Sequence, residues 1–135
     1  MATITEDYCS FEVSKLLKDK GFDAECRAAY TNYGKLFTIQ IQQYITNILC
    51  SKGTLWYCIA PTHQMAIKWL REKHKLLISI FPMETTVGIE TLCYGIWRIT
   101  EDLYQPLYCG KVDNLVDSYE AAVEAAILYS LKNLI

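Results

Sequence analysis

The residues of this sequence with the most obvious chemical potential are two histidines and six cysteines. His63 and His74 fall in one predicted helix, eleven positions apart, which separates them by about 16 Å along the axis. One straight helix therefore cannot bring both imidazoles to the same metal ion. We expect ordinary structural roles for both histidines and no metal site, because neither has an acidic partner at a metal-ligand spacing.

The cysteines do not have the spacing of a zinc knuckle or a redox motif. The closest pair, Cys50 and Cys58, has seven residues between its members, whereas those motifs need two. We therefore expect the cysteines to be buried as small apolar side chains. A cysteine–histidine nucleophile stays open, because such pairs meet in space and not in sequence. It would require a fold that brings His63 or His74 to a thiol or a carboxylate. The six are Cys9, Cys26, Cys50, Cys58, Cys93 and Cys109.

Other catalytic motifs are missing from the sequence. It contains no G-x-S-x-G elbow, no glycine-rich phosphate loop and no H-E-x-x-H. Glu101 and Asp102 are adjacent acids in a predicted turn, where solvation explains them better than acid–base catalysis. We accordingly assign no catalytic residue and no cofactor, and we expect a protein that is not an enzyme.

Length and composition indicate one globular domain over residues 1–135, with a loose end at 1–8. The 135 residues are 52% hydrophobic and 21% charged, which is close to globular averages and argues against disorder. The formal net charge of -2 gives no overall basic field for nucleic acid or an acidic membrane. No apolar run approaches the roughly 20 residues that span a bilayer, and the N-terminus lacks the features of a secretory signal. We therefore expect a cytoplasmic protein without a membrane partner.

The first half of the chain predicts one helix and two or three strands. A helix is expected from Ser10, a good N-cap, to about Lys20, with Gly21 ending it. Residues 23–34 have little periodicity and are interpreted as a connection. A period of two from Leu36 predicts a strand, but 41–50 satisfies both the strand and the helix pattern. Strand is preferred there for its β-branched residues, returning through 51–53 into a strand at 55–59.

The second half predicts a helix at about 63–75, entered through Pro61 and Thr62. Strands are expected at 76–81, at 89–100 and, more briefly, at 107–109, with Pro106 confining the last one to a sheet edge. A final helix should begin near Asp117, where Glu120 completes a capping-box-like start. The element order α-β-β-α-β-β-(β)-α predicts a single two-layer α+β domain, with helices packed on an antiparallel sheet.

Three stretches together resemble a family of small uncharacterised proteins from the genomes, phages and mobile elements of gut bacteria. They are residues 9–22, residues 60–62 leading into 68–74, and residues 117–122 leading to 134–135. The resemblance covers most of the chain and is weakest at 30–58. It implies a single cytosolic domain and a prophage or mobile-element origin, and it brings no catalytic residue.

The predicted helix at 63–75 carries a basic outer face, formed by Lys68, Arg71 and Lys75. Such a face could contact nucleic acid phosphates, although mixed-charge helix surfaces are ordinary. A nucleic-acid-binding module is therefore our alternative hypothesis. It predicts that Lys68→Glu combined with Arg71→Glu abolishes a salt-sensitive interaction, and unchanged binding would exclude it.

The final helix is apolar over more than one side, because Ala121, Ala125 and Leu128 widen its main stripe. Such a helix is either packed deeply on the sheet or shared with a second subunit. Ten tyrosines, four phenylalanines and three tryptophans also exceed what one core needs, and aromatic patches favour protein interfaces. For the tryptophans themselves, core packing is the default interpretation. Our leading hypothesis is a non-enzymatic accessory protein that acts through an unknown protein partner or by self-association.

Overall fold

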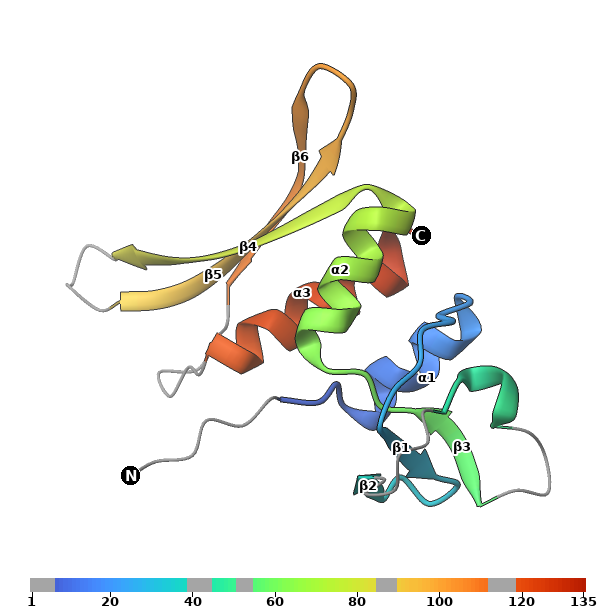
Figure 1. Ribbon diagram of the computed structural model, residues 1–135. Coiled ribbons are helices and arrows are strands. Elements are labelled where there is room, and N and C mark those ends of the chain that lie inside the picture. The colour runs from blue at the N-terminus through green and yellow to red at the C-terminus, as the bar shows by residue number, and fades with distance from the viewer. Residues whose placement is uncertain (1–6, 39–44, 51–54, 85–89, 112–118) are drawn as a thin grey trace, which may run out of the picture. The chain divides into compact units, whose positions relative to one another are not determined.

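The computed structural model describes residues 7–38, 45–50, 55–84, 90–111 and 119–135 (Figure 1). These residues form three α-helices and two antiparallel three-stranded sheets. The predicted α+β class is confirmed, with the strands divided between two sheets where one was expected. The chain separates into two compact units, Met1–Ala66 and Ile67–Ile135. A single domain over 1–135 stays a prediction.

The first unit begins with helix α1 (Phe11–Asp19), whose two ends are those that the sequence predicts. The Ser10 hydroxyl accepts a hydrogen bond from the amide of Val13, which satisfies one of the free donors of the first turn. At the other end Gly21 has a φ of 88°, a conformation that glycine adopts without strain. This turn lets the amide of Phe22 donate to the Leu17 carbonyl at 2.9 Å, so a Schellman-type cap ends the helix.

The sheet of the first unit has the order β2-β1-β3, with β1 at Ala28–Thr31, β2 at Leu36–Thr38 and β3 at Trp56–Ile59. The central strand β1 lies where a connection was expected, so that prediction was wrong. Its four residues are all buried, and a strand covered on both faces loses the alternation that identifies strands in a sequence. The predicted strand at 55–59 is confirmed, although its partner is β1.

The preference for strand over 41–50 was wrong at 47–49, whereas Ile45 forms an antiparallel β-bridge with Cys26. Asn47–Leu49 form a short 3-10 helix, and 39–44 and 51–54 lie outside the described residues. The Asn47 side chain donates to the Phe22 carbonyl and accepts from the Ile59 amide, each at 3.0 Å. These two bonds give the Phe22 carbonyl and the Ile59 amide partners that strand pairing would otherwise have to supply. The Asn47 side chain therefore outweighs the strand preference of the β-branched residues around it.

Lys18 links α1 to β3 and to Cys50, the residue that follows the 3-10 helix. Its ammonium donates to the backbone carbonyls of Cys50 at 3.0 Å and Tyr57 at 2.5 Å, and it lies 4.8 Å from the centre of the Tyr57 ring. Tyr30 makes a similar link, because its hydroxyl donates to the Cys9 carbonyl at 2.5 Å. Both bonds fix α1 through backbone acceptors.

The end of the chain at 1–8 was expected to be loose, and this was wrong for Asp7 and Tyr8. Tyr8 forms a β-bridge with Thr62, and the Asp7 carbonyl accepts from the amide of His63 at 2.9 Å. Residues 1–6 lie outside the described residues. The bridge leads directly into helix α2 (His63–His74), where the Thr62 hydroxyl caps the amide of Met65 at 3.3 Å.

Helix α2 has the two faces that the sequence predicts. Ala66, Trp69 and Leu70 are buried, whereas Lys68 and Arg71 are exposed. The helix ends at His74, and the next residue, Lys75, has a φ of 55°. A side chain in this left-handed region costs roughly 1 to 2 kcal/mol, so the turn into β4 is strained.

The sheet of the second unit has the order β4-β5-β6, with β4 at Leu76–Glu84, β5 at Glu90–Ile99 and β6 at Tyr104–Lys111. The three predicted strands are confirmed and two of them are longer than expected. Pro82 does not end β4, because the strand lies at a sheet edge where no ladder donor is required. Pro106 lies in the other edge strand, as predicted.

Helix α3 (Tyr119–Asn133) packs on β4 and β5. Its predicted start at Asp117 lies outside the described residues. Tyr108 of β6 stacks on Tyr129 of the helix, with ring centres 3.7 Å apart, and also contacts Tyr94 of β5. The Tyr94 ring in turn lies directly over Gly110, where only a residue without a side chain fits. The buried positions of α3 are Ala122, Val123, Ala126, Ile127, Ser130 and Leu131.

Candidate interaction site

The face of the second sheet that is turned away from α3 carries an apolar groove. Tyr94 and Tyr108 point towards α3, and side chains alternate between the two faces of a strand. Gly95 and Trp97 therefore point the other way. Gly95 pairs with Ser79 of β4 and Cys109 of β6, and Trp97 pairs with Pro106, so all three strands contribute to this face.

Gly95 creates the depth of the groove. A Cβ atom at this position would lie 3.1 Å from both the Ser79 hydroxyl and the Trp97 indole nitrogen, which is tighter than ordinary contact. Without that atom, the Trp97 indole N–H donates to Ser79 Oγ at 3.3 Å across the glycine. The hydrogen bond holds the indole at a fixed orientation and gives its polar atom a partner, so its remaining surface is apolar.

The groove has a volume of about 420 Å³. None of the seven described residues that line it is charged, and most of them are aromatic or aliphatic. A concave surface of this composition favours the burial of apolar groups of a partner. We refer to it as the sheet groove. Its lining residues are Phe81, Gly95, Trp97, Pro106, Leu107 and Cys109, together with Tyr108, which lies between the last two in sequence and stacks its ring on Tyr129 of α3.

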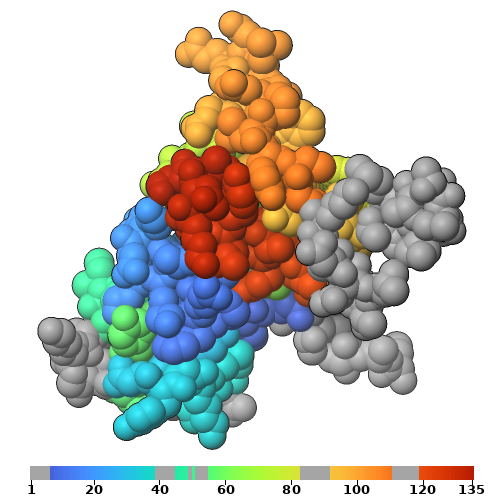
Figure 2. Space-filling model, turned by 180° about the vertical axis from the view of Figure 1, so that it is seen from behind, coloured from blue at the N-terminus to red at the C-terminus, as the bar shows by residue number. Residues whose placement is uncertain are grey.

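The sheet groove lies beside an edge strand that is poorly suited to strand pairing. Pro106 has no amide hydrogen, and the β5–β6 register shifts between Ile96 and Trp97; both features discourage edge-to-edge association. The far end of the β5–β6 hairpin projects beyond α3 in Figure 2, where the hairpin is orange and the helix is red. Leu103 in the hairpin turn and Tyr104 at the start of β6 are 72% and 64% exposed.

The three basic residues predicted to contact nucleic acid lie on α2 and at its end. Lys68, Arg71 and Lys75 are all exposed. Lys68 lies 4.0 Å from Glu72, and both side chains are more than half exposed, so the acid offsets part of the positive charge on this face. Nucleic-acid binding by this face stays a prediction.

The predicted interaction face on α3 is only partly open. Ala121 is exposed, but Ala125 and Leu128 are half-buried. The excess apolar surface of this helix is therefore smaller than its sequence indicates.

The two histidines have different surroundings. His63 is half-buried, and one of its ring nitrogens lies within 4.8 Å of the Cys9 sulfur, so the fold does bring one histidine close to a thiol. Cys9 is completely buried and its thiol lies 3.9 Å from the Thr62 carbonyl. A thiol in that position cannot reach an external substrate, and we assign it no catalytic role. His74 contacts the edge of Trp69, with ring centres 4.6 Å apart.

Five cysteines are buried free thiols, as predicted, but Cys109 is exposed. Burial raises the pKa of Cys26 and Cys58 to about 12 in each case, so both remain protonated at neutral pH. Trp69 is buried, whereas Trp56 and Trp97 are only half-buried.

Sequence analysis did not identify the sheet groove. Its one signal was Gly95 inside a predicted strand, directly after Tyr94 and two residues before Trp97.

No family model, curated protein or solved structure matches this chain. Membership of the family that its sequence resembles therefore stays a prediction. Among the described residues, none of the helices combines the length and the hydropathy that crossing a bilayer requires.

Proposed function

We propose that this protein is a non-enzymatic accessory protein that acts through protein contacts, and that the partner on the sheet groove is a second copy of the same chain. The observation that supports this most is the uncharged lining of the groove on a sheet face turned away from its helix. The outer face of a two-layer protein is usually polar and solvated, so an apolar groove on that face indicates a contact with a partner. A second copy supplies that contact.

A two-fold arrangement suits this surface. In such a dimer the same patch meets itself, so a charged patch would repel its copy and an uncharged one does not. Pro106 disfavours pairing through the edge of β6, which leaves the face as the contact. A reducing, cytoplasmic setting is part of the proposal, because an exposed free thiol at Cys109 suits a compartment that keeps thiols reduced.

The size of the face sets the expected affinity. Strands of nine and ten residues give a length of about 30 Å, and three strands give a width of about 14 Å. The resulting area of roughly 400 Å² is about half of the roughly 800 Å² per partner in a standard interface. We therefore expect a weak dimer that forms at micromolar or higher concentrations.

Sedimentation equilibrium over a wide range of protein concentration tests the proposal. Leu107→Glu places a carboxylate in each groove and should shift the protein to monomer. Leu103→Glu is the matched control, because it makes the same change in the exposed hairpin turn outside the groove. The proposal is wrong if the wild-type protein remains monomeric at several hundred micromolar, or if both variants dimerise like the wild type.

A further inference from the structure

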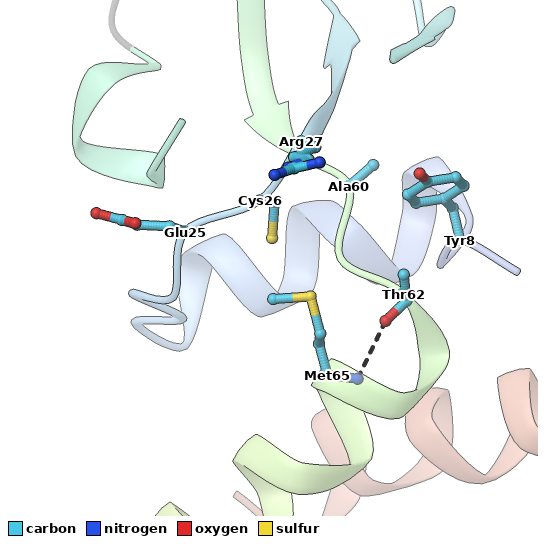
Figure 3. Close-up of a pocket in the computed structure, with 7 residues that line it drawn as sticks. All are labelled: Tyr8, Glu25, Cys26, Arg27, Ala60, Thr62 and Met65. Atoms are coloured by element: carbon cyan, nitrogen blue, oxygen red, sulfur yellow. Dashed lines mark hydrogen bonds between the residues drawn. The ribbon is translucent and has the colours of Figure 1, made fainter. Parts of the chain in front are cut away.

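The first unit contains a second cavity that the proposed function does not use. Its volume is about 240 Å³. It lies between Cys26, which precedes β1, and the first turn of α2 (Figure 3). All of its lining residues belong to the first unit. They are Tyr8, Glu25, Cys26, Arg27, Ala60, Thr62 and Met65.

The cavity has one polar end and one apolar end. Figure 3 shows the Arg27 guanidinium and the Tyr8 ring at the level of Ala60. Below them the sulfur atoms of Cys26 and Met65 both project into the cavity. The Thr62 hydroxyl is directed to the Met65 amide, which it caps at 3.3 Å. The guanidinium and the phenol therefore form the polar end of the cavity, and sulfur and methyl groups form its apolar end.

We propose that this cavity binds a small monocarboxylic acid with a short apolar tail. The carboxylate accepts hydrogen bonds from the Arg27 guanidinium, whose planar fork fits that group, and from the Tyr8 hydroxyl. The tail lies against Met65, which is unbranched and adapts to the shape of a ligand. This site is independent of the sheet groove, so either proposal can fail alone.

Two neighbours restrict the charge of the ligand. The Cys26 thiol is 3% exposed and stays neutral at pH 7, because burial raises its pKa to about 12. The apolar end of the cavity, where this thiol lies, therefore does not repel an anion. The Glu25 carboxylate points away from the other lining residues (Figure 3), and its negative charge at the rim disfavours a ligand with a second carboxylate. We therefore specify a monocarboxylate.

The volume limits the length of the tail. A volume of about 240 Å³ suits a short chain better than a long one. We take hexanoate, which has eight non-hydrogen atoms, as the chain length that fills the cavity. Each buried methylene should strengthen binding about fourfold, which is the ratio expected from its transfer out of water. Affinity should therefore rise from acetate to hexanoate and stop rising beyond it.

The test is a titration of the full chain, labelled with ¹³C at its methionine methyl groups, with sodium acetate, butyrate, hexanoate and decanoate. Of the three methyl signals, that of Met65 is assigned with Met65→Leu. We expect a saturable shift of the Met65 signal with hexanoate, at least tenfold weaker binding in Arg27→Gln, and about threefold weaker binding in Tyr8→Phe. Arg71→Gln removes the same charge from α2 and should bind like the wild type.

Uncharged and cationic analogues complete the experiment. Hexanol and hexylamine carry the same tail without the carboxylate, and we expect neither to saturate the site. Equal binding of hexanol and hexanoate would identify a merely apolar cavity and overturn the proposal. A linear shift of Met65 with hexanoate, or hexanoate binding that Arg27→Gln and Tyr8→Phe both leave unchanged, would overturn it as well.

Discussion

Replacement of Gly110 by alanine should strongly destabilise the second unit. The new Cβ atom would collide with Cζ and the hydroxyl oxygen of Tyr94 and would lie 2.7 Å from Cε1 of the same ring. Tyr94 is 7% exposed and contacts Tyr108, which stacks on Tyr129. The ring therefore has no open space to move into.

The expected cost follows from these contacts. Overpacking of a core costs about 1 to 3 kcal/mol, and disturbance of an aromatic pair adds about 0.5 to 1.5 kcal/mol. We therefore expect Gly110→Ala to lower the free energy of unfolding by about 2 to 4 kcal/mol. With a urea dependence near 2 kcal/mol per molar, the unfolding midpoint should fall by about 1 to 2 M.

A double-mutant cycle in urea separates the collision from other effects of the substitution. In a Tyr94→Ala background the obstacle is gone, and Gly110→Ala should then cost almost nothing. Gly95→Ala is the matched control in the neighbouring strand, where the closest atoms would be 3.1 Å away and the cost should be smaller. The reasoning is refuted if Gly110→Ala costs no more than Gly95→Ala, or if its cost is the same with and without the Tyr94 ring.

Three further predictions concern stability and can be measured by urea unfolding. Lys75→Gly should raise the free energy of unfolding by about 1 kcal/mol, because Lys75 has a φ of 55° that glycine adopts without strain; an unchanged or lower value would contradict the strain. Lys18→Met should lower it by about 1 to 3 kcal/mol, because two backbone carbonyls lose their common donor, and a neutral effect would show that the ammonium does not fasten α1. Stability should fall as the pH rises from 9 to 12, because the folded state holds the protons of Cys26 and Cys58 up to a pKa of about 12 and unfolded thiols release them near 9. Replacing both cysteines by alanine should flatten this decline relative to the wild type.

The elements with complete local signals could be predicted from the sequence. The Ser10 cap and the Gly21 stop defined α1, and the two faces of α2 followed from its periodicity. Both ends of α1 depend on backbone groups within a few residues, so no distant contact was needed to infer them. The same holds for Pro106, whose missing amide hydrogen alone restricted β6 to a sheet edge.

The elements that depend on distant contacts could not be predicted. Strand β1 is buried on both faces and carries no alternation, and the turn at Asn47 depends on backbone groups of Phe22 and Ile59. The sheet groove also depends on distant contacts. Its walls come from three strands, and their register brings Ser79 and Cys109 beside Gly95. A pattern within one segment does not contain that register.

The most direct test of self-association through the sheet groove uses Cys109, the exposed one of the six thiols. Cys109 lines the sheet groove, so two grooves that face each other place both Cys109 thiols in the same interface. Treatment with a short bismaleimide cross-linker should then give a covalent dimer that requires Cys109, is lost in Leu107→Glu and persists in Leu103→Glu. Absence of the dimer at several hundred micromolar protein, or a cross-link that Leu107→Glu does not reduce, would contradict self-association through this face.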